Sequence, residues 1–338
     1  YASASWNHRK IYADCDRNGQ WTLALPTPEA GGPYTITFSD GEELTLKNIL
    51  IGEVWFCSGQ SNMEMPVKGF RGQPVYGSQP YIVSANPKRP LRLYTVKNNW
   101  STTPKEEGID GQWSEASSEE VADFSATAYF FGNLLQQSLD VPVGLIHCSW
   151  SMSKIEAWMD KETLSHFSEV TLPDTNQDKF EWAAGTPTLL WNAMVNPWKG
   201  FPVKGVIWYQ GEANVGRDKQ YVPLFQSLIA DWRKQWNTDF PFYFVQLANF
   251  LKPQEVQPNS QWAALREAQA EALHVDNTGM VVAIDLGVSY DIHPKNKQEV
   301  AKRFATLALA NTYHQGEYIM PACQSYNISG KKSVSYTH

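Results

Sequence analysis

The strongest constraint on the fold is an alternation of short apolar runs and helical segments that begins near residue 49. The runs are rich in valine and isoleucine and occupy residues 50–57, 141–148, 203–209, 242–248 and 279–286. Such runs are typical of strands buried on both faces of a parallel sheet. Helical periodicity follows in residues 121–139, 220–236, 259–273 and 297–312. The pattern predicts an α/β fold, a doubly wound parallel sheet of about five strands.

Residues 1–48 follow a different pattern, in which apolar and polar residues alternate at 21–25 and 34–38 between glycine, proline and aspartate. This predicts short antiparallel strands, too few for an independent core. We interpret the segment as part of a β-sandwich module packed against the α/β domain at 49–315. The polar, β-like tail at 316–338 is either an edge strand on that module or part of a third region.

Two long stretches, residues 66–120 and 160–190, contain little regular signal and much proline, glycine and serine. Loops of this length in a compact domain are often functional.

Composition excludes several classes of partner. The net charge is −7 and no basic block occurs, so nucleic acid is not an expected partner. No apolar stretch is long enough for a membrane span. The chain opens on YASASWNHRK, without the apolar core of a signal peptide, and such a peptide is absent from any processed chain. We expect a periplasmic or secreted location.

Cysteine and tryptophan usage adds two expectations. The four cysteines are far apart, without zinc-site spacing, and we expect buried free thiols, although a disulfide stays open: Cys15, Cys57, Cys148 and Cys323. Most of the 14 tryptophans are expected in the core, but exposed ones would suit stacking on sugars.

Polar side chains follow the ends of four predicted strands. Ser61 lies in the turn after the first strand, residues 149–152 follow the second, 210–214 the third and 290–294 the fifth. Ligands of such sheets bind beyond the carboxyl ends of the strands, so these segments are expected to meet. A serine in a glycine-containing turn, an amide-rich turn and an Asp/His pair are the components of acyl-transfer catalysis.

Each component has an expected role. His293 would take the proton of Ser61, and Asp291 would hold the imidazole tautomer. An oxyanion needs fixed donors, and the candidates are the backbone N–H of Ser61, the backbone N–H of Ser151 and the side-chain amide of Gln210. The pattern alone also fits a polar turn with an N-cap serine. Residues 59–63 (GQSNM) do not match the G-x-S-x-G elbow.

The same residues carry a family resemblance. Residues 52–66 (GEVWFCSGQSNMEMP) resemble the signature of the sialate O-acetylesterases, a carbohydrate-esterase branch of the SGNH hydrolases. Residues 206–214 (VIWYQGEAN) and 291–298 (DIHPKNKQ) resemble later blocks, and 30–34 and 266–269 look familial too. The match runs in family order over nearly the whole chain.

The resemblance implies an SGNH fold and ester hydrolysis through an acyl-enzyme, with no metal or organic cofactor. It assigns Ser61 as nucleophile and His293 as base, and it implies that the Gln210 region binds the oxyanion. It also implies that residues 1–48 belong to a larger accessory module and that the partner is an O-acetylated carbohydrate.

Two departures from the family pattern stand out. The second block usually reads Ser-Trp-Gly-Gly-Thr, whereas residues 149–153 read SWSMS. A backbone donor survives the loss of glycine only where its φ and ψ suit a side chain, and Met152 would alternatively narrow the acyl pocket.

The second departure concerns the acid. The superfamily places aspartate three residues before the histidine, where this chain has Tyr290. Asp291 is the first candidate and Asp285 the alternative, and a Ser–His dyad with a backbone carbonyl is also open.

Further residues are expected to support the site. Asn62 and Glu64 would fix the nucleophile turn, Glu212 would position its loop or act as a second base, and His147 reads as a core histidine. Support from the amide-rich turn and from beneath the site is expected of two more residues, Asn214 and, from the resemblance, Arg266.

The sequence therefore predicts a serine esterase that removes O-acetyl groups from carbohydrates, foremost O-acetylated sialic acids. One alternative is an acetyl esterase of plant hemicellulose such as xylan or xyloglucan. Another is a catalytically impaired sugar-binding module, which the substitution at residues 151–152 and the tryptophan count motivate. The oligomeric state stays open.

Overall fold

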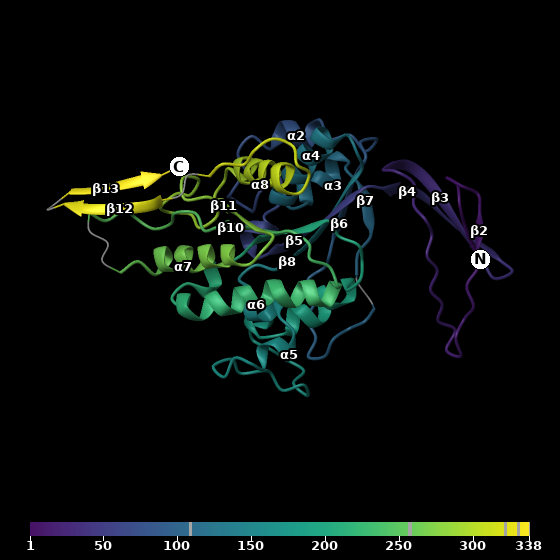
Figure 1. Cartoon of the computed structure of the whole chain (residues 1–338), viewed down its shortest axis with the longest axis horizontal. Coiled ribbons are helices and arrows are strands. Elements are labelled where there is room, and N and C mark those ends of the chain that lie inside the picture. Colours follow the sequence, from purple (N-terminus) through teal and green to yellow (C-terminus); the bar gives the residue numbers. More distant parts are fainter. Residues whose placement is uncertain (108–109, 256–258, 321–322, 330–331, 338) are drawn as a thin grey trace.

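A seven-stranded sheet forms the centre of the molecule (Figure 1). The computed structural model describes residues 1–107, 110–255, 259–320, 323–329 and 332–337. The strands are, in spatial order, β11 (Thr278–Val282), β10 (Phe242–Gln246), β9 (Gly205–Tyr209), β5 (Glu53–Gly59), β8 (Val143–Ser149), β6 (Leu91–Thr95) and β7 (Trp113–Glu115). All neighbours pair in parallel except β6 with the edge strand β7.

Helices cover both faces of this sheet, which confirms the predicted doubly wound α/β fold (Figure 1). One face carries α3 (Ser118–Asp123), α4 (Ala126–Leu139) and α8 (Lys297–Asn311), and α4 packs against α8. The other face carries α6 (Asp218–Trp236) and α7 (Gln261–Ala270). The chain fills β6 and β8 on one side of β5 and then β9 to β11 on the other, so the order switches at β5.

The alternation of side chains along the strands separates two apolar cores. On β5, Trp55 and Cys57 face the core under α4 and α8, whereas Phe56 faces the core under α6. On β9, Ile207 and Trp208 divide in the same way. Because both faces of these strands are buried, their sequences are apolar throughout, which is why the runs could be recognised.

The N-terminal strands form a separate antiparallel sheet at one end of the molecule (Figure 1). Its order is β2 (Lys10–Ile11), β1 (Ala2–Ala4), β3 (Gly31–Ser39) and β4 (Glu43–Ile51). The strand expected at 34–38 lies in β3, but the one expected at 21–25 does not form. Trp21 instead packs its ring near Phe38 from an irregular segment, which gives the same apolar spacing without a ladder.

The sequence missed part of the central sheet. The stretch 66–120 contains β6 and β7 and the short α2 (Gln79–Val83), so the sheet has seven strands rather than about five. β7 has three residues, and β6 and α2 have five each, which is too short for periodicity to identify reliably. The helix expected at 121–139 is two helices, because Ser125 leaves helical geometry and caps α4 through the N–H of Ala128.

Short helical turns complete the chain. They are α1 (Ser61–Glu64), η1 (Ile155–Trp158), α5 (Lys161–Leu164), η2 (Ala183–Gly185), η3 (Trp191–Val195), η4 (Asn196–Trp198), η5 (Glu212–Asn214) and η6 (Glu271–His274). Across the described ranges, no helix has both the length and the apolarity that crossing a bilayer requires.

The C-terminal strands β12 (Cys323–Ser329) and β13 (Lys332–Thr337) pair with each other. They project from the end of the molecule away from the N-terminal sheet (Figure 1). The tail is therefore not an edge strand of the N-terminal module, which was one of the two expectations.

Two of the cysteines match the expectation of buried free thiols. Cys57 and Cys148 are buried in the two cores, and burial raises the pKa of both thiols. Cys15 is a free thiol but is exposed, so the expectation was wrong there. The side chain of Cys323 lies outside the described part of the structure.

Candidate active site

The carboxyl ends of three neighbouring strands bring the predicted blocks to one edge of the sheet. Gly59 on β5 pairs with Ser149 on β8 and with Tyr209 on β9. Gly59 has a φ of 143°, and a Cβ there would lie 2.1 Å from the carbonyl oxygen of Tyr209. Only glycine allows this close approach. The chain can then turn sharply into α1, whose first residue is Ser61.

The Gln60 side chain connects the Ser61 turn to the turn after β9. Its Oε1 accepts hydrogen bonds from the backbone N–H groups of Gly211 and Ala213, at 3.3 and 3.2 Å. Ser61 itself is 9% exposed. Its position at the start of α1 leaves its backbone N–H without an intrahelical acceptor.

One amide links the residue after Ser61 to the residue before His293. Nδ2 of Asn62 donates to the carbonyl oxygen of Ile292 at 3.1 Å and to Oε1 of Glu212 at 2.5 Å. The predicted nucleophile and base, 232 positions apart in sequence, therefore lie on segments that are joined by a direct hydrogen bond.

Asp291 is the carboxylate beside His293. Its Oδ1 accepts the backbone N–H of His293 at 2.9 Å and lies 3.6 Å from Nδ1 of the imidazole. Gln73 donates to the same oxygen at 3.3 Å, and Phe70 presents an edge-to-face contact to the ring at 5.4 Å. Burial lowers the pKa of His293 and nearby Lys297 lowers it further, whereas Asp291 raises it. Imidazole is thus favoured in the neutral form that a base needs.

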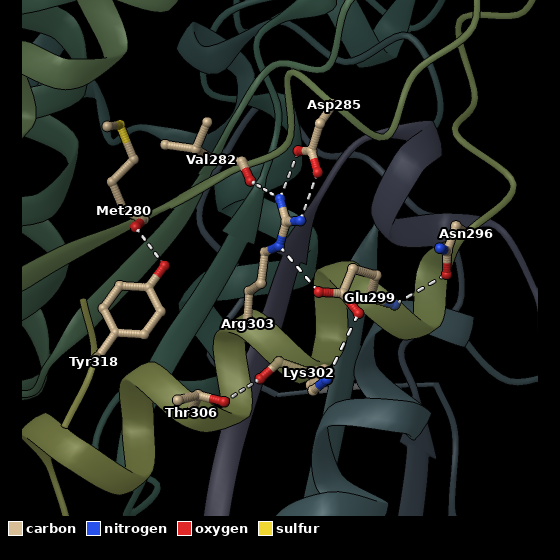
Figure 2. Close-up of polar contacts among 9 residues, drawn as sticks. All are labelled: Met280, Val282, Asp285, Asn296, Glu299, Lys302, Arg303, Thr306 and Tyr318. Carbon is tan, nitrogen blue, oxygen red and sulfur yellow. Dashed lines mark hydrogen bonds and ion pairs between the residues drawn. The ribbon is translucent and has the colours of Figure 1, made fainter. Parts of the chain in front are cut away.

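Asp285, the alternative acid, is held by another partner (Figure 2). Its two oxygens accept a bidentate pair of hydrogen bonds from Arg303, each 2.7 Å long. Arg303 also donates to the carbonyl oxygen of Val282 and to Glu299, and its hydrogen bonds to Asp285 lower the pKa of that carboxyl. The side chain of Asp285 is 56% exposed. Among the described residues, Asp285 makes no contact with His293, which its alternative role as the acid would require.

The side chain of Gln210 is directed away from the site, which corrects its expected role as an oxyanion donor. It is completely buried, and its Nε2 donates to the carbonyl oxygen of Ser153 at 3.0 Å and to Oδ1 of Asn214 at 2.8 Å. Both amide hydrogens are therefore used. Asn214 in turn donates to Glu156 and accepts from the N–H of Ile155, so both amides stabilise the turn beneath the site.

The backbone N–H of Ser151, a predicted oxyanion donor, is already hydrogen-bonded within the protein. Its backbone N–H donates to Oε2 of Glu64 at 2.5 Å, and its hydroxyl donates to the same oxygen. The other oxygen of Glu64 accepts from Asn98 at 3.3 Å. Glu64 therefore connects α1 to the loop after β8, and Ser151 can offer its N–H to another oxygen only when Glu64 moves.

The side chains of two other predicted residues, His147 and Arg266, make no hydrogen bond with Ser61 or His293 in the described part of the structure. His147 is buried with its Nε2 2.6 Å from the hydroxyl of Ser149, and burial lowers its pKa to about 4, as suits a neutral core histidine. The side chain of Arg266 on α7 makes no hydrogen bond or ion pair with the described residues. Its carbonyl oxygen accepts from Gln246.

Comparison with known proteins bears on what this site does. Residues 51–310 match the family described as carbohydrate esterase, sialic acid-specific acetylesterase. The chain belongs to this family. It is 31% identical over 336 residues to the sialate O-acetylesterases of Homo sapiens and Pongo abelii, in alignments that cover 90% of this chain and 63% of each relative. The chain thus spans less than two thirds of the length of these curated relatives.

A solved structure supports the assignment of the fold. A carbohydrate acetylesterase from Xanthomonas citri superposes with a TM-score of 0.87 and 36% sequence identity, covering 100% of this chain and 74% of its own. The resemblance to the sialate O-acetylesterases and the SGNH-like fold are confirmed.

Within this acetylesterase family, the second block of the present chain departs from glycine at a position that favours it. Met152 has a φ of 62° and is 65% exposed. A non-glycine residue in this left-handed region costs about 1–2 kcal/mol. The side chain points into solvent, so the expectation that Met152 narrows a pocket is not met by this arrangement.

Sequence reasoning missed one residue of this candidate site. Lys297, the first residue of α8, is completely buried and donates to Oδ1 of Asn62. The signal was present: Lys297 lies three residues before Val300 and seven before Phe304, on the apolar stripe of the helix. A lysine on a core-facing stripe needs an internal partner.

Proposed function

We propose that this chain is a serine esterase that removes O-acetyl groups from a carbohydrate, with Ser61 as nucleophile and His293 as base. The observation that carries the proposal is the contact between Asp291 and His293, on a loop whose Ile292 carbonyl oxygen accepts a hydrogen bond from Asn62, the residue that follows Ser61. Membership of the acetylesterase family supports the same reaction.

The proposed reaction has two halves. His293 removes the hydroxyl proton as Oγ of Ser61 attacks the acetyl carbonyl, and the imidazolium then gives that proton to the departing sugar hydroxyl. Water attacks the acetyl-enzyme with His293 again as base, which releases acetate and restores Ser61. Asp291 accepts the Nδ1–H and stabilises the imidazolium, a contact that we expect to shorten from 3.6 Å when the ring becomes charged.

Backbone donors would hold the developing oxyanion. The N–H of Ser61 lies at the start of α1, and the N–H of Ser151 already binds a negatively charged oxygen in Glu64. We infer that substrate displaces Glu64 from Ser151. Each oxyanion donor is worth roughly 10²–10³ in rate.

The proposed substrate is an O-acetylated sialic acid. The family description and the sialate O-acetylesterases among the relatives support this choice, whereas acetylated xylan or xyloglucan is the competing class. We further propose a periplasmic or secreted location, and a division into an accessory segment at 1–48, a catalytic domain at 49–315 and a tail at 316–338. Acetate release from O-acetylated sialic acid, compared with acetylated xylan and xyloglucan at equal acetyl content, tests the substrate.

The catalytic assignment is tested by Ser61→Ala with p-nitrophenyl acetate as substrate. We expect kcat/KM to fall by at least about 10³-fold, because removal of the nucleophile leaves only binding and the oxyanion donors. Cys15→Ala, which changes an exposed nucleophile outside the site, should retain full activity. Equal rates for Ser61→Ala and the unmodified protein would contradict the assignment, and would favour a sugar-binding module that lacks catalysis.

A further inference from the structure

Lys297 is a buried cation that the proposed reaction does not use. It is 0% exposed, and it stands at the first position of α8, where the helix dipole disfavours a positive charge. Burying an ammonium costs several kcal/mol unless other groups compensate. Helix stability therefore does not explain this lysine, and its partners must.

The partners of Lys297 come from three other elements. Nζ donates to Oδ1 of Asn62 on α1 and lies 5.1 Å from the centre of the Tyr209 ring at the end of β9. Glu212 in η5 and Asp291 in the loop before α8 are the carboxylates that raise its pKa, against burial, which lowers that pKa to about 7. Burial raises the pKa of Glu212, whose Oε2 has no hydrogen-bond partner in the described part of the chain.

The chemistry of lysine determines how the Asn62 amide is oriented. An ammonium has three donors and no acceptor, so it can face only the oxygen of an amide. With Oδ1 held by Lys297, both hydrogens of Nδ2 are directed at Glu212 and at the carbonyl oxygen of Ile292. A rotation of the amide by half a turn would oppose donor to donor at Lys297 and would break the link to Ile292.

We propose that Lys297 is a positioning residue, which acts through Asn62 to hold the Ser61 turn against the His293 loop. The inference rests on the proposed function. It extends that function by assigning a role to a residue that touches neither the substrate nor the reacting atoms. The ammonium also affects the proposed base electrostatically: beside burial, Lys297 lowers the pKa of His293, whereas Asp291 raises it.

Lys297→Met and Lys297→Gln separate the two effects with p-nitrophenyl acetate. Met removes the donor, so we expect kcat to fall about 10²-fold, as for a misplacement of about 1 Å, with KM within about threefold. Gln keeps one donor for Asn62, so kcat should stay within about tenfold of the unmodified protein. Both remove the charge that lowers the pKa of His293, so both should move the acid limb of the kcat/KM profile to higher pH. In the unmodified protein that limb should lie below about 6.5.

A double-mutant cycle tests whether Lys297 acts through Asn62. Asn62→Ala should lower kcat by about the same factor as Lys297→Met, and the double variant should be no more than about twofold worse than either, because the two residues act as a unit. Lys302→Met, which removes an exposed lysine from the same helix, is the matched control and should change neither kcat nor the pH profile.

Three outcomes would overturn the proposal: an unchanged kcat in Lys297→Met, equal losses in the Met and Gln variants, or additive losses in the double variant. If circular dichroism shows that Lys297→Met does not fold, Asn62→Asp replaces it. Asp still accepts from Lys297 but cannot donate to Ile292, so an unchanged kcat would refute the clamp. Failure of the esterase assignment would appear separately, as activity retained by Ser61→Ala.

Discussion

The two loops on either side of β5 that approach Ser61, one with His293 and one with Ser151, differ in how their polar groups are held. On the His293 side, Asn62 is hydrogen-bonded to Glu212 and to the buried Lys297, and the buried Asp291 accepts the backbone N–H of His293. On the Ser151 side, the backbone N–H of Ser151 donates to Glu64. Met152, the next residue, is exposed and has a left-handed backbone conformation. Under the proposed mechanism, the loop of the base is already fixed in the free protein, whereas Glu64 has to move before Ser151 can bind the oxyanion.

The largest effect among the tests of this comparison is expected at Asp291, the proposed acid. Asp291→Asn should lower kcat by about 10²-fold or more, because an amide next to Nδ1 no longer stabilises the imidazolium and can favour the wrong tautomer. Steady-state kinetics with p-nitrophenyl acetate measures this loss. The matched control is Asp285→Asn in the same loop, which should leave kcat within about twofold because Asp285 binds Arg303. The reverse ranking would show that the wrong carboxylate has been assigned.

A smaller effect of opposite sign is expected on the Ser151 side. Glu64→Gln replaces a charged acceptor by a weaker neutral one, so the Ser151 N–H is released more easily. We expect kcat/KM to rise about fivefold, which corresponds to about 1 kcal/mol for the lost charge assistance. Initial rates at low substrate concentration give this ratio. A loss of tenfold or more would mean that Glu64 assists the reaction, and that the oxyanion site is already open.

The same contrast explains what could be predicted from the sequence. The parallel strands were recognisable because burial on both faces makes their sequences largely apolar. The site could then be predicted because the carboxyl ends of parallel strands meet at one edge of the sheet. β7 has three residues at the sheet edge, too few for any periodicity. The other elements that were not predicted, β6 and α2, are also short.

The directions of the side chains could not be predicted from the sequence. Gln210 lies in the expected turn, yet its amide faces Ser153 and Asn214 because the turn itself needs both hydrogens. Asp285 and Asp291 both precede His293, but Asp285 binds Arg303 on α8, whereas Asp291 contacts His293. The contacts with Ser153 and with Arg303 join residues far apart in sequence, so they depend on tertiary packing rather than on local pattern.

The most direct test of the account is the location of the acetyl group during turnover. The protein would be mixed with p-nitrophenyl acetate, quenched in acid within the first turnover and digested, and its peptides analysed by mass spectrometry. The account predicts one acetyl group on Ser61, which disappears in Ser61→Ala. An acetyl group on another residue that is kinetically competent, with Ser61 unmodified throughout turnover, would contradict it.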